Sequence, residues 1–365
     1  MRNFALLSTS LLAGIVTIAP AHAVDVKLYG QVNKALVGYG DGANTDFAVV
    51  DNDNSSTRFG LKGEQALDNG MTASVLLEME SQSNASDLYT QNDTAGQSAT
   101  PVSSGTTNLA ERHAAVGLAG QWGGLVLGKT STANDGVFTK DKGGVNDLMT
   151  SDFFRLAGGL EFLTSADAKS GTSIKDMSFD GGVDRSQVLR YDSPKVNGLS
   201  GKLSLAQGGD VDASAQYEAK FAGFDMLANG GIKLNNDTTA GSNTVDTRYI
   251  AALTAKHDSG FAGTLAYTTD SLGSKTTTAE EPDQWYGKVS YAWDAYEVAA
   301  DYGMANNYGA FTTATSEITT YGVGGQYNMG NGVSLSGMYR NFDADVTGSS
   351  LQGIDLFVAN MRVKF

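Results

Sequence analysis

The sequence predicts an all-β protein, a transmembrane antiparallel up-and-down β-barrel of sixteen strands. Three observations lead to this prediction. Segments of about ten residues alternate between apolar and polar side chains, which is the period of a strand with one apolar face and one wet face. The connections between these segments are alternately tight turns and long polar loops. The mean hydropathy of -0.20 excludes a bundle of apolar helices and agrees with strands that turn half of their side chains to water.

Residues 1–23 are predicted to form a cleavable secretory signal peptide. Arg2 supplies a charged start, an apolar stretch runs from Leu11 to Ala19, and Ala21-His22-Ala23 provides a small-x-small cleavage site. The apolar stretch is too short to span a membrane as a helix. We therefore expect two regions, a signal peptide at 1–23 and a barrel at 24–365.

The composition narrows the classes of function. The formal net charge is -15, and it becomes -16 once Arg2 leaves with the signal peptide, so nucleic acid is not an expected partner. The chain has no cysteine, which excludes a disulfide framework and a thiolate metal site. Because only 4 residues are proline, few positions would interrupt the backbone pairing of strands.

The first strand segments show the pattern most clearly. Residues 26–40 alternate between the two faces, and a loop rich in Asp and Asn is expected from Asp41 to Asn54. The segment 56–67 again separates apolar from charged residues. The turn at 68–70 ends in Asn-Gly, a strong hairpin signal, and leads into the segment 71–83.

Later connections keep the alternation of short and long. Short turns are expected at residues 119–124, 193–198, 222–225, 257–260, 293–296 and 328–332, and long loops at 84–107, 131–184, 236–246, 271–283, 305–316 and 343–353. An even number of strands places both ends of the barrel wall on the same side of the membrane. Aromatic residues cluster at strand ends, as they do in the interfacial girdles of membrane barrels.

The last twelve residues, IDLFVANMRVKF, form a strand that ends the chain on an aromatic residue. One parity carries Phe357, Ala359, Met361, Val363 and Phe365, and the other carries Asn360, Arg362 and Lys364. An unpaired terminal strand of this kind is an aggregation hazard, so we expect it to be paired.

Five stretches together resemble the general porins of Gram-negative outer membranes, which are trimeric sixteen-stranded diffusion channels. The stretches are VKLYGQVN, RFGLKGEQALDNGMTASVLLEME, ERHAAVGLAGQWGGLVLGK, VLRYDSPKVNGLSGKLSLAQ and VANMRVKF. They correspond to the first seven strands and the last strand of that family. The resemblance implies a homotrimer in outer-membrane lipid, with a water-filled lumen for passive diffusion of ions and small hydrophilic solutes. It also implies that Phe365 ends an assembly signal.

In this family the third external loop folds into the barrel and narrows it opposite a basic wall. The resemblance gives this role to residues 131–184, with Asp147, Asp152 and Glu161 as candidate loop carboxylates. The candidates for the basic wall are Arg58, Lys62, Arg112 and Arg190. Glu78 and Glu80 have lumen parity and are expected to neutralise part of this wall, whereas simple alternation predicts that His113 faces outward.

No catalytic constellation is recognised. After removal of the signal peptide the histidines His113 and His257 stand alone in their segments, so no enzyme activity, metal or cofactor is expected. A substrate-selective channel for a sugar, a phosphate or an acidic solute stays open as an alternative, as do a barrel enzyme and a plugged structural barrel. The acidic net charge favours a mild preference for cations.

Overall fold

The computed structural model describes residues 25–91, 109–179, 184–236, 245–273, 280–309 and 315–365. The predicted signal peptide, residues 1–23, lies outside these ranges. No helix in the described part of the chain is long and apolar enough to cross a membrane.

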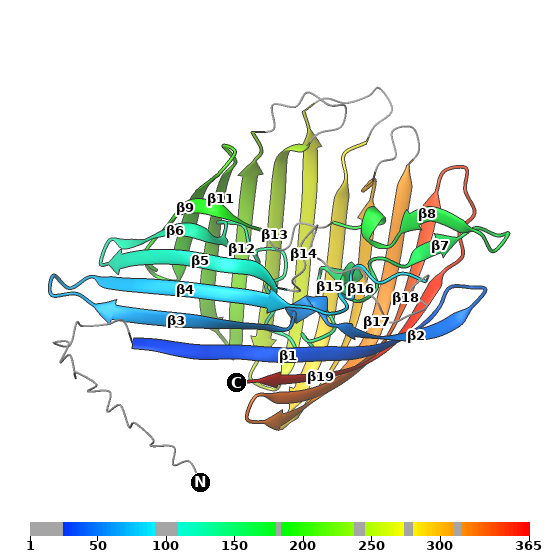
Figure 1. Cartoon of the computed structure of the whole chain (residues 1–365), viewed down its shortest axis with the longest axis horizontal. Coiled ribbons are helices and arrows are strands. Elements are labelled where there is room, and N and C mark those ends of the chain that lie inside the picture. Colours follow the sequence, from blue (N-terminus) through cyan, green and yellow to red (C-terminus); the bar gives the residue numbers. More distant parts are fainter. Residues whose placement is uncertain (1–24, 92–108, 180–183, 237–244, 274–279, 310–314) are drawn as a thin grey trace, which may run out of the picture.

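The described strands of the wall form one closed antiparallel barrel (Figure 1). Each strand pairs with the next wall strand along the chain, and β1 closes the barrel by pairing with β19 from Gln31↔Lys364 to Gly40↔Asp355. β2 and β3 are two halves of one wall strand, because both pair with the same edge of β1. The described wall therefore has the sixteen strands that the sequence predicts. Its segments are β1 (Asp25–Gly40), β2 (Thr45–Asp51), β3 (Arg58–Ala66), β4 (Thr72–Ser81), β5 (Leu109–Gly120), β6 (Gly123–Ser131), β9 (Arg185–Asp192), β10 (Leu199–Ala206), β11 (Val211–Phe221), β12 (Phe224–Leu234), β13 (Val245–His257), β14 (Phe261–Leu272), β15 (Asp283–Trp293), β16 (Tyr296–Asn306), β17 (Ser316–Gly330), β18 (Val333–Val346) and β19 (Ile354–Lys364).

The first external connection is shorter than expected. A loop was predicted from Asp41 to Asn54, but β2 occupies seven of these residues. β1 has 16 residues and extends beyond β3, so its outer half needs a second partner, which β2 supplies. Phe47 and Val49 of β2 are exposed and continue the apolar outer face. The prediction of a loop is therefore wrong for these seven residues, and the alternation of Phe47 and Val49 was the available signal.

Side chains alternate between the outside of the barrel and its lumen. In β14, for example, Leu265 is 64% exposed on the outer face, whereas its neighbour Thr264 is 5% exposed and points inward. On the outer face a series of aromatic contacts follows the end of the barrel where the short turns lie. Its members are Phe261, Tyr291, Trp293, Tyr296 and Tyr327, with ring centroids 4.6 to 5.8 Å apart. This series forms part of an interfacial girdle.

The connection from β6 to β9, as far as it is described (residues 132–179 and 184), folds into the barrel. It contains η2 (Phe153–Leu156), the hairpin of β7 (Glu161–Leu163) and β8 (Lys169–Ser173), and η3 (Lys175–Met177). We call this connection the inner loop. Its buried apolar side chains include Phe138, Leu148, Met149, Phe154, Leu160, Phe162, Ile174 and Phe179, which belong to one core with Ile250, Tyr286, Ile318, Met338, Phe342, Ile354 and Leu356 of the wall. At roughly 1.5–3 kcal/mol for each large apolar side chain buried, this packing holds the inner loop firmly against β13 to β19.

Polar contacts fix the inner loop to the same wall. The side chain of Lys288, on β15, is 1% exposed and lies 2.6 Å from the carboxylate of Asp141. Its ammonium group also donates hydrogen bonds of 2.9 Å to the carbonyl oxygens of Gly144 and Met149. The lumen on this side of the barrel is therefore filled, whereas the opposite wall borders a cavity.

Candidate functional site

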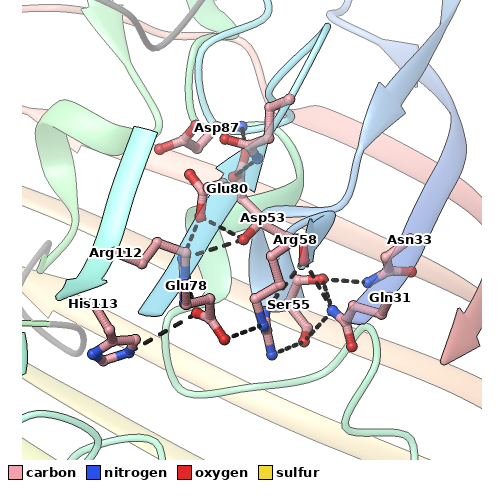
Figure 2. Close-up of polar contacts among 12 residues, drawn as sticks. Gln31, Asn33, Asp53, Ser55, Arg58, Glu78, Glu80, Asp87, Arg112 and His113 are labelled. Carbon is pink, nitrogen blue, oxygen red and sulfur yellow. Dashed lines mark hydrogen bonds and ion pairs between the residues drawn. The ribbon is translucent and has the colours of Figure 1, made fainter. Parts of the chain in front are cut away.

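Two arginines and two glutamates from three neighbouring strands form an ion-paired cluster on that opposite wall (Figure 2). Arg58 begins β3, Glu78 and Glu80 lie on β4, and Arg112 lies on β5. Arg112 Nε lies 2.6 Å from Glu78 Oε1, and Arg112 Nη1 binds Glu80. Arg58 Nε lies 3.5 Å from Glu78 Oε2, which also accepts a 2.9 Å hydrogen bond from the hydroxyl of Tyr29. Glu78 therefore positions both guanidinium groups and neutralises part of their charge.

A β-bulge sets the direction of Arg112 and His113. Glu78 pairs with His113 and Met79 pairs with Glu111, so Arg112 is an extra residue on β5. The extra residue shifts the alternation by one position, and His113 faces the lumen with its Nε2 3.9 Å from Glu78 Oε1 (Figure 2). The prediction that His113 faces outward is therefore wrong, because counting alternate residues assumes a strand without a bulge.

The cluster borders a cavity of about 470 Å³ in the lumen. Five cationic side chains line it, namely Arg58, Arg112, Arg155, Lys175 and Arg185. Three carboxylates line it, namely Asp53, Glu80 and Asp87. The described lining therefore carries an excess of positive charge.

The inner loop supplies cations to this cavity. Arg155 lies in η2 and stacks on the ring of Phe154, with 4.7 Å between the guanidinium carbon and the ring centroid. Lys175 begins η3 and lies 5.7 Å from the same centroid. Phe154 is fully buried, so it holds both cations at the edge of the loop core. Arg155 stands within the aromatic segment DFFRLAGG, which is a weak signal for it, and no pattern in the sequence indicates Lys175.

Arg185, the first residue of β9, completes the cationic lining. Its Nε is buried and has no hydrogen-bond partner among the described residues. The alternation of β9 would turn Arg185 outward with Leu189, but the residue lies at the end of its strand and reaches the cavity. Sequence reasoning missed Arg185 for that reason.

The three predicted loop carboxylates are placed elsewhere in the described structure. Asp147 is buried and lies 2.6 Å from Arg362 of β19. Asp152 is buried beside η2, with an oxygen 3.4 Å from Arg155 Nη2. Glu161 begins β7 and lies 3.4 Å from Lys169 of β8, so the turn of this hairpin directs it toward its own partner strand. None of the three is among the side chains that line the 470 Å³ cavity.

The other predicted residues lie on the wall but outside the lining of this cavity. Lys62 lies four residues after Arg58 on β3, and its Nζ lies 5.2 Å from the ring centroid of Tyr29. Arg190 forms two hydrogen bonds, of 2.8 and 2.9 Å, with Asp192 of its own strand. Both stay candidates for the basic wall, at levels nearer the short turns.

Phe365 lies where the barrel closes. Its N–H and carbonyl oxygen exchange 3.0 Å hydrogen bonds with the carbonyl oxygen and N–H of Gly30 on β1. A Cβ on Gly30 would lie 2.5 Å from the ring of Phe365, so the absence of a side chain at residue 30 makes room for the terminal aromatic. The role of Phe365 in assembly stays a prediction.

Within the described ranges, no group of three or more His, Cys, Asp or Glu side chains could hold a metal ion. The site is thus a charged cavity bordered by guanidinium, ammonium and carboxylate groups. Its chemistry allows electrostatic selection of ions and polar solutes.

Comparisons with known proteins agree with this fold. Residues 8–347 match the family model described as Gram-negative porin. The fold is similar to the anion-selective porin from Comamonas acidovorans, with a TM-score of 0.63 and 16% identity over 94% of this chain and 100% of that chain. It is also similar to in-vitro folded OmpT of Vibrio cholerae in its trimer form (TM-score 0.60, 15% identity, 94% of this chain and 100% of that chain). A third similar structure is Salmonella typhi OmpF in complex with daunomycin (TM-score 0.57, 15% identity, 93% and 97%). No curated protein sequence matches this chain.

Proposed function

Because this chain belongs to the Gram-negative porin family and is an outer-membrane channel for passive diffusion, we propose that small hydrophilic anions cross it more readily than cations of similar size. The single observation that carries this proposal is the excess of cations around the 470 Å³ cavity between the inner loop and the wall of β3 to β5 and β9. Charges at a narrow passage with low-dielectric walls act more strongly on a permeating ion than charges elsewhere on the protein.

This proposal replaces the preference for cations that the net charge of -15 favours. Charges on exposed loops are screened over about 10 Å in 0.1 M salt, so they contribute little inside the passage. Arg58 and Arg112, by contrast, are 23% and 16% exposed at the passage itself. The anion-selective porin of Comamonas acidovorans, which has a similar fold, gives this proposal further support.

The transverse arrangement of charge explains the preference for hydrophilic solutes. Glu80 and Asp87 lie among the five cations, and charges of both signs would order water in the cavity. An apolar solute would displace this water without replacing its interactions. We assign the chain no catalytic activity.

A homotrimer is the proposed assembly. The outer face of the first wall strands exposes several apolar side chains at the position where the two ends of the barrel wall meet. The set comprises Leu28, Val32, Leu36, Phe47 and Val49. One of the similar structures is described as a trimer form, which supports this assembly.

A channel selective for phosphate or an acidic solute is the second candidate. Arg185 favours it, because a buried guanidinium Nε without a partner among the described residues can donate to a carboxylate or phosphate oxygen. The two candidates differ in how the chloride current responds to added phosphate or acidic solute. In a selective channel the bound anion would block the chloride current, and the block would saturate with concentration. In a simple diffusion channel the added anion would not block the current.

Reversal potentials of the wild-type channel across a tenfold KCl gradient test the proposal. We expect the sign that corresponds to chloride permeating faster than potassium. A potential of the opposite sign would contradict it. Adding millimolar phosphate or succinate to one side then separates the candidates, since a reduction of the chloride current that saturates with concentration would support the selective channel.

A further inference from the structure

The connection from β4 to β5 begins inside the barrel. Its residues 82–91 are described, and several of them are as deeply buried as the core, with Ser86 at 0% and Tyr89 at 3% exposure. We call residues 82–91 the second inner segment. It supplies Gln82, Asp87 and Leu88 to the lining of the 470 Å³ cavity.

Asp51, the last residue of β2, binds the start of the second inner segment. Its fully buried carboxylate accepts hydrogen bonds from the backbone N–H groups of Ser83 and Asn84, at 2.8 and 3.0 Å. Its backbone carbonyl accepts a 3.0 Å bond from the N–H of Ser86. The segment is therefore tied to its own barrel at the point where the wall strand breaks between β2 and β3.

Asp53, in η1 (Asp53–Ser55), binds the next part of the segment. Its carboxylate accepts a 3.0 Å hydrogen bond from the backbone N–H of Asp87, while its own N–H donates to Ser86 Oγ at 3.0 Å. Figure 2 shows Asp87 and Asp53 on the same side of the cluster as Glu80. These bonds aim the side chain of Asp87 at the cavity.

The far side of the second inner segment contacts the inner loop. Asp87 Oδ2 lies 3.2 Å from Lys175 Nζ and 3.8 Å from Arg155 Nη1, and the Asp87 side chain is 11% exposed. One carboxylate thus bridges a segment of residues 82–91 to two cations of the inner loop, whose core also includes Tyr89 of this segment.

Two glycines permit this contact. A Cβ on Gly158 would lie 2.7 Å from the carbonyl oxygen of Asp87, and a Cβ on Gly159 would lie 2.5 Å from that of Tyr89 and 2.7 Å from that of Leu88. Such distances are shorter than real Cβ contacts, and the atoms they meet belong to the backbone. Gly158 and Gly159, the Gly-Gly pair of the segment DFFRLAGG, therefore allow the backbone of the second inner segment to pack directly against the inner loop.

We propose that the passage is bounded by two loops of the same chain, and that Asp87 adjusts its charge and helps to hold them together, beside the hydrogen bonds between Gln91 and Glu161. The inference rests on the proposed function, since it concerns the same passage. It adds Asp87 of the second inner segment as a specificity-determining residue. It also gives the Gly-Gly pair a role in the contact between the second inner segment and the inner loop of the same subunit.

The substitution D87N tests the charge. It keeps the size of the side chain and removes one of the three carboxylates of the lining. A unit charge about 6 Å from the path of an ion, screened over about 10 Å, changes the anion-to-cation permeability ratio about threefold to fourfold. We expect the ratio to rise by this factor. D176N is the matched control, because Asp176 neighbours Lys175 but is exposed and bonds to Ser173.

The substitution G159A tests the contact. A methyl group there requires the second inner segment to move, so we expect a higher conductance and larger current fluctuations in the open state. G263A is the control, since a Cβ on Gly263 of β14 meets only one atom, at 3.9 Å.

The outcomes separate this inference from the proposed function. If D87N and G159A both behave as wild type while substitution of Arg58 and Arg112 changes selectivity, the passage is real and the second inner segment does not bound it. If none of these variants changes selectivity, the proposed passage itself is wrong. Should G159A fail to assemble, D87N alone decides, because its side chain is isosteric with the original.

Discussion

The substitution R58Q/R112Q tests the basic wall most strongly. Both side chains line the cavity, and the change leaves three cations against three carboxylates in the described lining. Glu78 lies directly behind the pair and loses both ion-pair partners, so the wall becomes acidic. We expect the preference for anions to be lost and the conductance to rise, since glutamine is shorter than arginine.

The size of the effect follows from Coulomb's law. One unit charge about 6 Å from an ion contributes about 0.7 kcal/mol at the dielectric constant of water, and screening in 0.1 M salt reduces this to about 0.4 kcal/mol. The contribution has opposite signs for anions and cations, so the loss of two charges changes their difference by about 1.5 kcal/mol. The anion-to-cation permeability ratio should therefore fall about tenfold.

The assay is the reversal potential of single channels across a KCl gradient, measured beside R58K/R112K. Lysine keeps both charges, so this control should retain the preference for anions although it loses the paired N–H groups that bind Glu78. A double glutamine variant with unchanged selectivity and conductance would refute the reasoning and place the narrow zone elsewhere. Heat-modifiable migration in gels shows whether each variant is folded before it is recorded.

Three further predictions concern assembly and stability. Deletion of Phe365 removes the two hydrogen bonds that this residue forms with Gly30 of β1. We expect the shortened chains to reach the periplasm but to be depleted from the outer membrane. Normal amounts of the shortened chain in outer-membrane fractions would count against an assembly role for Phe365. The substitution K288M leaves the buried carboxylate of Asp141 without its cation, so the inner loop should lose about 3–5 kcal/mol of anchoring. Thermal unfolding in detergent checks this, and an unchanged midpoint would show that Lys288 is dispensable. Light scattering of the native detergent complex should find three chains per particle, and a single chain would end the trimer proposal.

The barrel could be predicted from the sequence because a membrane wall repeats one pattern. Each strand must present apolar side chains to lipid at every second residue, and each hairpin needs a short turn, so local signals accumulate along the chain. β2 was missed because the many Asp and Asn residues around it indicate a loop. The alternation of Phe47 and Val49 contradicts that composition, and pairing with the long strand β1 decides the outcome.

The apolar core between the inner loop and the wall was harder to predict, although one strand of the sequence carries a signal of it. Ile354, Leu356 and Val358 face inward on β19 while Phe357 faces outward, so this part of the strand is apolar on both faces. Strands of that kind are buried on both sides, which indicates that something covers the lumen face. The sequence does not say which loop residues cover it, because side chains in an irregular loop follow no period.

The same limit explains the partial prediction of the site. Arg58, Glu78 and Glu80 could be placed by parity on regular strands. Arg155 and Lys175 stand in irregular turns, and the contact between Lys175 and Asp87 joins residues 88 positions apart. Such a contact depends on how two loops fold within the barrel, and alternation along one strand carries no information about it.

Single-channel recording of the purified wild-type protein in a planar bilayer tests the central claim most directly. The claim is that the inner loop leaves an open, ion-conducting passage along the wall of β3 to β5 and β9. We predict discrete conductance steps with a stable open level, produced by protein that migrates as a folded, heat-modifiable complex. Folded protein that inserts into the bilayer and gives no steps would show that the inner loop plugs the lumen, and would contradict the account.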